Sequence, residues 1–200
     1  MNTGLREQKK RATRVAIADI ATGLFERDGF DAVSIAQIAG EAGVAKMTVT
    51  NYFARKEDLV FDRHEQVVSA LAATVTHRAA GESPLEAIRR DYLAAVARHD
   101  VMIGFGRVSF ARMIEQSPTL VARLRELMDL RERALADVLR EVLDVDDVMA
   151  LFHAARLASV HRILFTEARR SLLAGHSAED LERFLTSAAT RMFDLLAVDF

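Results

Sequence analysis

One short stretch of the chain gathers side chains that suit contact with nucleic acid. Lys46, Met47, Thr50 and Asn51 fall within six residues, and at helical spacing they share one outer face. Ammonium, hydroxyl and amide groups donate hydrogen bonds to phosphate oxygens and base edges, and a methionine can contact a thymine methyl group. The pattern therefore indicates a binding helix, although a solvated helical hairpin would have the same spacing.

The flanking residues predict a helix-turn-helix that positions this face. Ser34 followed by Gln37 is a capping-box pattern, which starts a first short helix. Gly43 supplies the positive φ that a tight exit from that helix requires. Val49 and Phe53, four residues apart, form the buried side of the second helix. An amphipathic helix with a stop at Asp28-Gly29 precedes the pair, so three helices share one small core.

Charge is distributed unevenly along the chain. Residues 1–56 carry a net charge of +3, whereas the remainder carries −5, although the whole chain is only mildly acidic at −2. A basic region at one end favours contact with nucleic acid, because phosphate neutralisation supplies most sequence-independent affinity. A solvated basic tail is the alternative interpretation of this asymmetry.

Several unrelated motifs coincide between about Arg11 and Leu59. They are Gly29-Phe30, Val33-Ser34-Ile35, Ile38-Ala39, Ala42-Gly43-Val44, Lys46, Thr48, Tyr52-Phe53 and Lys56-Glu57-Asp58-Leu59. Together they resemble the DNA-binding head of the TetR family of bacterial transcriptional regulators.

This resemblance implies roles for eight residues. Four are expected to hold DNA phosphates: Ser34, Thr48, Tyr52 and Lys56. Four are expected to face the major groove: Lys46, Met47, Thr50 and Asn51.

The sequence departs from the family pattern at two places. Met47 stands where a small residue is common and Thr50 where an aromatic residue is common, so base preference does not transfer across these positions. Ala54-Arg55 replaces a common Pro-Ser helix cap, which weakens capping there but adds a positive charge.

Beyond Lys56 the sequence predicts only helices. Ser83-Pro84 and Ser117-Pro118 each place serine at an N-cap and proline at the first helical position. No runs of alternating β-branched residues interrupt this region. The expected helices are 57–79, 84–99, 101–115, 118–143, 146–174 and 178–197.

We therefore expect an all-α fold of about nine helices in two domains. Residues 1–56 are expected to form the helix-turn-helix DNA-binding domain with a basic N-terminal arm. Residues 57–200 are expected to form a larger helical domain for ligand binding and dimerisation. The helix that begins near Glu57 is expected to run from one domain into the other as a stiff connection.

The last two helices have the composition of an interface. Residues 151–165 are apolar on nearly every side, and the small Ala154 and Ala158 permit close approach of another helix. A two-fold four-helix interface between helices 146–174 and 178–197 of two copies is expected, in line with the family resemblance. An ordinary monomeric core is the alternative.

A small-molecule pocket in the second domain is expected from bulky apolar residues and polar anchors. The candidate ligand-binding residues are Tyr92, Phe105, Arg107, Phe110, Met113, Met128, Phe152 and Arg156. Most of these side chains would serve equally well as plain core. Gly104-Phe105-Gly106 is interpreted as a flexible helix segment beside the cavity.

Other functional classes find little support. The chain has no cysteine, which excludes thiol nucleophiles and cysteine-based zinc sites. No histidine follows a glutamate at the spacing of a di-iron bundle, and no His-Glu-x-x-His or Gly-x-Ser-x-Gly motif occurs. We therefore expect no enzyme activity, no cofactor and no metal.

No uninterrupted apolar run reaches the ~18 residues of a membrane span, and the basic N-terminus has no apolar signal region. A cytoplasmic location without membrane contact is expected.

The sequence as a whole predicts a homodimeric transcriptional regulator. It would bind double-stranded DNA at a palindromic operator and act as a repressor that a small, largely apolar effector releases. A ligand-independent architectural DNA binder and a dimeric helical interaction module without DNA binding are the alternatives.

Overall fold

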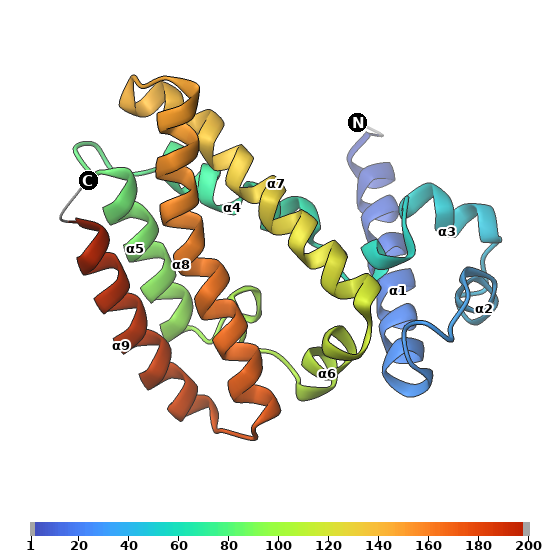
Figure 1. The fold of residues 1–200 in the computed structure, drawn as a ribbon. Coiled ribbons are helices and arrows are strands. Elements are labelled where there is room, and N and C mark those ends of the chain that lie inside the picture. The colour runs from blue at the N-terminus through green and yellow to red at the C-terminus, as the bar shows by residue number, and fades with distance from the viewer. Residues whose placement is uncertain (1–2, 198–200) are drawn as a thin grey trace. The chain divides into compact units, whose positions relative to one another are not determined.

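The computed structural model describes residues 3–197, and this part of the chain contains helices without strands (Figure 1). The described α-helices number nine, which confirms the predicted all-α class. The elements are α1 Thr3–Asp28, α2 Ile35–Glu41, α3 Lys46–Tyr52, η1 Lys56–Leu59, α4 His64–Thr76, α5 Pro84–Ala97, η2 Val101–Ile103, α6 Val108–Gln116, α7 Pro118–Leu143, α8 Asp147–Leu173 and α9 Ala178–Leu196.

The chain divides into two compact units. The first contains the N-terminal residues through His64 together with Arg112–Arg123, and the second contains Glu65–Ala111 and the residues from Leu124 onward. The end of α6 and the first turns of α7 therefore belong to the N-terminal unit. Because α7 is one continuous helix, it carries residues of both units.

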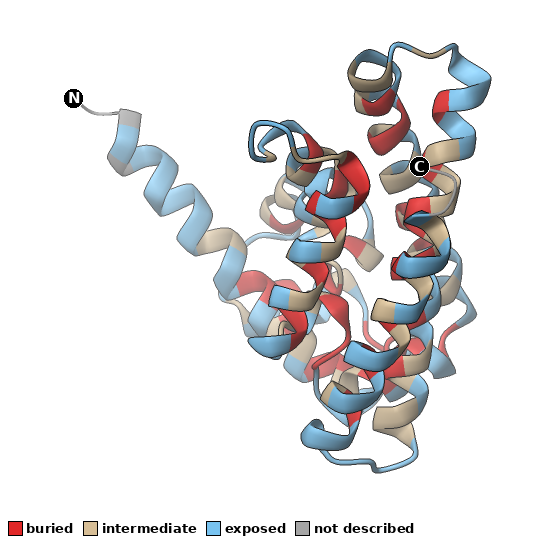
Figure 2. Cartoon of the chain, turned by 90° about the vertical axis from the view of Figure 1, so that its left-hand side faces the viewer, coloured by how far each residue is buried: buried red, intermediate tan, exposed pale blue. Residues whose placement is uncertain are grey.

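The first unit is built around the apolar side of α1. Ile17, Ala21 and Phe25 are almost fully buried there, and the Phe25 and Phe30 rings lie 5.0 Å apart. The N-terminal half of α1, by contrast, is exposed over most of its surface (Figure 2). The basic arm expected from the sequence is thus part of a 26-residue helix.

The expected helix over residues 57–79 is wrong. The structure has a 3-10 helix at Lys56–Leu59 and a separate α4 at His64–Thr76, so no continuous helix begins near Glu57. The Asp58 carboxylate accepts a hydrogen bond from the Arg55 backbone N–H at 3.2 Å, which caps the start of this 3-10 helix.

The expected helix over 101–115 is also interrupted. Gly104 adopts φ +119° between η2 and α6, and a Cβ atom there would lie 2.4 Å from the Cβ of Ala168 on α8. Gly104-Phe105-Gly106 is consequently a turn packed against α8 and not a helix segment. The glycine is required both by its backbone conformation and by this close approach.

The second unit contains the larger core. In Figure 1, α5, α8 and α9 lie side by side, and buried residues of α7 complete the same cluster. Its most buried members include Leu71, Val75, Ile88, Tyr92, Val96, Leu135, Leu139, Ala154, Leu157, Val160, Leu185 and Phe193.

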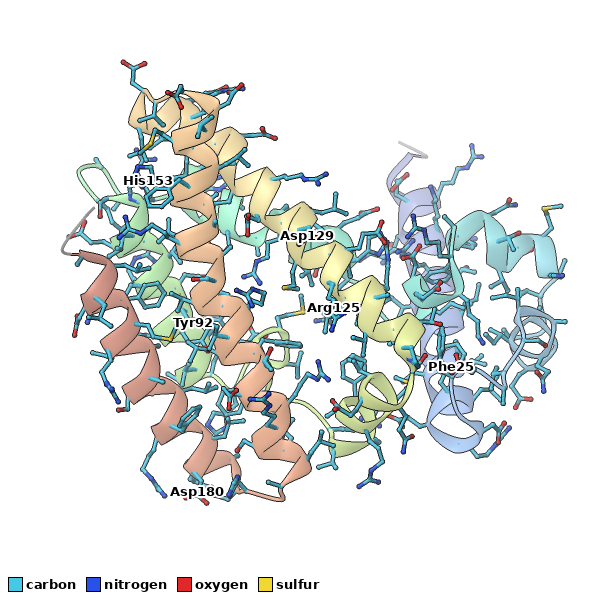
Figure 3. The ribbon with its side chains drawn as sticks, in the orientation of Figure 1. Phe25, Tyr92, Arg125, Asp129, His153 and Asp180 are labelled. Atoms are coloured by element: carbon cyan, nitrogen blue, oxygen red, sulfur yellow. The ribbon has the colours of Figure 1, made fainter. Side chains whose placement is uncertain are left out.

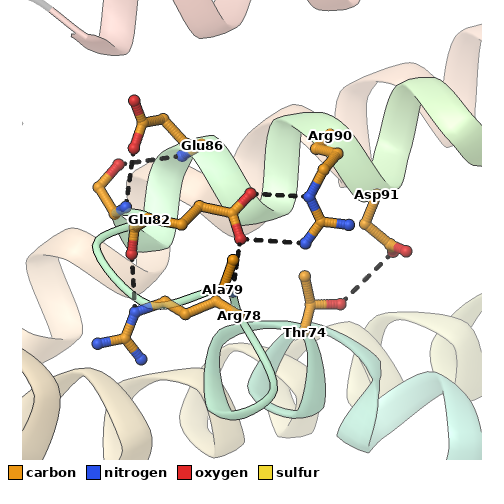
Figure 4. Close-up of polar contacts among 8 residues, drawn as sticks. Thr74, Arg78, Ala79, Glu82, Glu86, Arg90 and Asp91 are labelled. Carbon is orange, nitrogen blue, oxygen red and sulfur yellow. Dashed lines mark hydrogen bonds and ion pairs between the residues drawn. The ribbon is translucent and has the colours of Figure 1, made fainter.

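Polar contacts join α4 to α5 at one end of this unit (Figure 4). Glu82 accepts hydrogen bonds from Arg90 at 2.7 and 3.2 Å and from the Ala79 backbone N–H at 3.0 Å. Ser83 is the N-cap of α5, as the sequence predicts, and it forms a capping box with Glu86. These contacts fix the turn between α4 and α5.

Helix α8 bears on the expectation that the chain has no apolar run as long as a membrane span. Within the described residues, it is long and apolar enough to cross a membrane by length and composition alone. However, one side of α8 is buried in the core of the second unit, where Ala154, Leu157 and Leu164 pack among other helices. A core helix passes the same test of length and composition.

Candidate nucleic-acid interface

The helix-turn-helix forms as the sequence predicts. Ser34 Oγ accepts from the Gln37 backbone N–H at 3.2 Å, and Gln37 Oε1 accepts from the Ser34 backbone N–H at 2.7 Å. Gly43 has φ +63°, and the Val44 backbone N–H donates to Ala39 O at 3.0 Å in the turn. These local bonds start α2 and redirect the chain into α3.

Helix α3 divides into a buried side and an exposed side. Val49 is fully buried and Phe53, just beyond the helix, is nearly so. The predicted groove-facing residues Lys46, Thr50 and Asn51 are exposed, and 70% of the Met47 surface is accessible. A large apolar side chain that stays this exposed beside polar groups is available for a partner.

Met47 and Thr50, which both depart from the family pattern, contact one another. The Thr50 hydroxyl donates to Met47 O at 3.1 Å and lies 3.8 Å from Met47 Sδ. Because the hydroxyl hydrogen is used within the helix, the group that Thr50 offers to a partner is an acceptor oxygen.

Arg14 of α1 holds the C-terminal end of α3. Its Nη1 donates to Tyr52 O at 2.7 Å and its Nη2 to Asp62 O at 3.2 Å, while the guanidinium carbon lies 4.6 Å from the centre of the Phe53 ring. A cation is favourable at a helix C-terminus, where carbonyl groups lack helical partners. Sequence reasoning missed this role, because nothing local connects Arg14 to residues about 40 positions away.

Lys56 makes contacts within the first unit in addition to its expected role as a phosphate contact. Its Nζ donates to Phe30 O and lies 4.3 Å from the centre of the Phe30 ring. Burial lowers the pKa of the Lys56 ammonium. The ammonium retains further donor capacity beyond this bond, so Lys56 can join the head's core to a phosphate.

The remaining predicted contact residues surround the same helix. Ser34, at the N-cap of α2, is exposed, and Thr48 and Tyr52 on α3 are half-buried. The structure therefore places six of the eight predicted DNA-contact residues on α3, one at the start of α2 and one in η1. Their contacts with DNA stay predictions.

A buried ion pair ties η1 to the start of α7 within the first unit. Arg123 Nη2 and Nε donate to Asp58 Oδ1 at 2.7 and 3.2 Å, and both side chains are at least nine-tenths buried. At the same end of the unit, the Ser117 hydroxyl donates to Asp31 Oδ1 at 3.2 Å. These long-range contacts explain why residues 112–123 belong to this unit.

The exposed part of α1 adds positive charge to the first unit. Arg6, Lys9, Lys10 and Arg11 are all exposed on this helix. Two turns of basic residues on one helix are suited to phosphate oxygens.

The predicted ligand-binding residues are spread over both units. Tyr92 and Phe105 lie in the core of the second unit, whereas Met113 is buried in the first. Phe152 is 52% exposed, with the Arg156 guanidinium 5.3 Å from the centre of its ring. The other three are exposed or half-buried: Arg107, Phe110 and Met128.

Comparison with known proteins agrees with this architecture. Residues 17–62 match the family model described as bacterial regulatory proteins, tetR family. The chain is 29% identical over 164 residues to the HTH-type transcriptional regulator TcmR of Streptomyces glaucescens, an alignment that covers 76% of this chain and 73% of TcmR.

Solved structures share the fold. NalD, the secondary repressor of the MexAB-OprM multidrug efflux pump in Pseudomonas aeruginosa, has a TM-score of 0.56 at 18% identity, with 92% of this chain and 97% of NalD covered. A TetR transcriptional regulator from Rhodococcus sp. RHA1 has a TM-score of 0.51 at 21% identity, with 96% and 99% covered.

A helix-turn-helix head joined to a larger helical unit defines a DNA-binding transcriptional regulator. The head residues that match the family model include the capped α2, the glycine turn and α3. Over residues 17–62 the chain is similar to the tetR family of bacterial regulatory proteins.

Proposed function

We propose that this regulator is a dimeric repressor that binds a palindromic operator through α3 and is released by a small molecule. The observation that carries the proposal is the outer face of α3, where Lys46, Met47 and Asn51 remain exposed on a helix fixed from behind. Arg14 and the buried Val49 hold this helix in place. A rigid helix with an exposed polar face is suited to direct readout in a major groove.

Dimerisation is proposed to use the outer faces of α8 and α9. Large apolar side chains stay exposed on these helices: Val148, Met149, Leu151, Phe152, Ile163, Phe184 and Leu195. A face of this kind is unfavourable in water and favours association. Two copies joined in this way could present their heads about one DNA turn apart, ~34–36 Å, as a palindromic site requires.

Release is proposed to follow from ligand binding in the second unit. An effector changes DNA affinity only if it binds the DNA-bound and free conformations unequally. Helix α7 is a suitable connection, because it carries Arg123, which is bonded to Asp58 in the head, and continues into the second unit. A cytoplasmic location fits a protein that meets both DNA and a small molecule.

Selection of bound sequences from random DNA by the purified protein tests this proposal. The expected result is a palindromic consensus whose half-sites are about one helical turn apart. Binding without sequence preference and with a steep salt dependence would instead support an architectural DNA binder. No DNA binding by an intact dimer would support a helical interaction module.

The dimer is tested separately by Phe184→Glu and Leu195→Glu, two substitutions on the exposed side of α9. Sedimentation should show a dimer for the wild type and a shift toward monomer for the double variant. Glu substitution at the exposed Thr186 is the matched control. A double variant that remains fully dimeric would rule out this face.

A further inference from the structure

Three helices of the second unit bring polar groups together inside its apolar core. Tyr92 of α5 is 1% exposed and His161 of α8 is 5% exposed, and their rings meet edge to face with centres 4.8 Å apart. Arg131 of α7 reaches the same place, with Nη2 2.9 Å from His161 Nδ1. Figure 3 labels Tyr92 where its side chain lies between α5 and α8.

Each of these side chains has a buried polar atom without a hydrogen-bond partner among the described residues. The atoms are the Tyr92 hydroxyl, Arg131 Nε and His161 Nε2. A buried polar group without a partner is costly, and native proteins leave few of them. Three such atoms in one place therefore indicate that something else completes the cluster.

The contact between Arg131 and His161 determines what His161 offers. A guanidinium donates and never accepts, so His161 Nδ1 must be the acceptor of this bond. Burial, with the nearby Arg131 charge, holds the pKa of His161 well below its usual value, and the ring is neutral. The single ring hydrogen is then on Nε2, and that orphan atom is a donor.

All three orphan atoms can therefore donate. The Tyr92 hydroxyl keeps its proton, because burial raises its pKa. Burial lowers the pKa of Arg131 to about 10, which still leaves the guanidinium charged at neutral pH. A ligand that satisfies the three groups must present acceptor oxygens and not donors.

The cluster also has an unbalanced positive charge. No carboxylate oxygen of a described residue lies within 4.0 Å of the Arg131 guanidinium, and His161 contributes no charge of its own. Asp91, beside Tyr92 in the sequence, attracts the Arg131 charge at longer range and has Thr74 as its hydrogen-bond donor at 3.4 Å. An arginine whose Nε atom is buried and that has no direct ion pair is suited to an anion.

We infer that the effector carries a carboxylate or similar anionic oxygen that binds Arg131, the Tyr92 hydroxyl and His161 Nε2. The inference rests on the proposed function, and it names the chemical class of the ligand that releases the regulator. Tyr92 belongs to the same apolar core as Ile88, Leu157 and Phe193, and the centre of the Phe193 ring lies 6.3 Å from that of Tyr92. The ligand is thus an organic acid with an apolar body, held at its acidic end.

The position of Arg131 on α7 suggests how the acid acts on the head. Arg131 lies eight residues after Arg123 on α7. Arg123 is bonded to Asp58 in the head. A ligand bound to Arg131 therefore contacts the same helix that carries Arg123. It weakens DNA binding if it binds more tightly to the conformation without DNA than to the DNA-bound one.

The inference is tested on the full-length protein with three acids: benzoate, 1-naphthoate and decanoate. Each is paired with its uncharged primary amide, which has the same body but lacks the anion. Melting temperature and calorimetry report binding to the protein without DNA. Anisotropy with a selected operator fragment reports release.

At least one of the acids should bind the wild type and weaken its operator affinity, and its amide should bind at least tenfold more weakly. Arg131→Gln and Tyr92→Phe should each reduce acid affinity at least tenfold, whereas Arg133→Gln, on the same helix but exposed, should not. Tyr92→Phe should also raise the melting temperature of the free protein, because it removes an unsatisfied hydroxyl.

Absence of binding by all three acids would overturn the inference and would indicate that buried water completes the cluster. Acid binding that survives Arg131→Gln unchanged would also overturn it. If the protein binds an acid through Arg131 but binds no operator, the proposed ligand site is upheld and the proposed function as a regulator is rejected. Failure of the inference and failure of the proposed function are thus distinguishable.

Discussion

Arg123 donates two hydrogen bonds to the same oxygen of Asp58, although the two residues are 65 positions apart. The contact joins η1, which follows α3, to the first turns of α7. It makes a distant segment of the sequence part of the N-terminal unit. The head is therefore larger than the three helices that its motifs predict.

Asp58→Asn should destabilise the first unit, because it removes the carboxylate charge that is paired with the Arg123 guanidinium. Breaking a buried ion pair from one side costs about 3 kcal/mol or more. Chemical denaturation followed by circular dichroism measures the loss. Asp28→Asn, which removes an exposed pair with Arg27, is the control and should change the unfolding free energy little. Equal effects of the two substitutions would contradict this account.

Gly104→Ala should destabilise the second unit. The alanine would have to adopt φ +119°, and its Cβ would press on Ala168, for a combined cost of about 3 kcal/mol. Thermal unfolding measures the change. Gly175→Ala is a matched control, because Gly175 has φ +79° but open space around its Cβ position. A loss no larger than that of the control would show that the contact with Ala168 is unimportant.

Lys9→Gln combined with Lys10→Gln should weaken DNA binding through electrostatics alone. Both residues are exposed on α1, outside the helix-turn-helix. If both contact phosphates, the slope of log affinity against log salt should fall by about 2. Titrations of the selected operator at several salt concentrations measure this slope. An unchanged slope would show that the exposed part of α1 does not touch DNA.

The stability of the second unit should decrease in mild acid because His161 is buried and neutral. Its pKa lies well below the unfolded value of about 6.5 in the folded protein, so the unfolded chain binds more protons as pH falls. Stabilisation is complete above pH 6.5 and is lost below it, by up to about 1.4 kcal/mol per pH unit. Unfolding experiments between pH 7.5 and 5 measure this dependence.

His161→Gln should reduce the slope of the unfolding free energy against pH, because the unfolded variant binds one proton fewer. His77→Gln, at an exposed histidine, is the control. If His161→Gln keeps the wild-type slope, another group is responsible.

Local signals predicted much of this fold. Ser34, Ser83 and Ser117 each cap a helix where the sequence indicates a start, and Gly43 has the expected positive φ. The helices of the second unit largely follow their apolar spacing. These features depend on residues within a few positions of one another, so the sequence alone displays them.

Long-range contacts account for what the sequence did not predict. The break after Leu59 accompanies the pairing of Asp58 with Arg123, and the turn at Gly104 follows from its approach to Ala168. The role of Arg14 at the end of α3 has the same origin. Of the residues expected at a ligand site, Tyr92 belongs to the polar cluster. Arg131 and His161 were not expected there, because the contacts among these residues depend on the packing of three helices.

The central claim is that α3 reads a specific DNA sequence. The most direct test is an equilibrium titration of the selected operator and of a scrambled duplex, with the wild type and with Lys46→Ala combined with Asn51→Ala. The account predicts that the wild type prefers the operator by at least about 10³-fold at physiological salt, and that the variant loses most of this preference while still dimeric. Equal affinity of the wild type for both duplexes would contradict it.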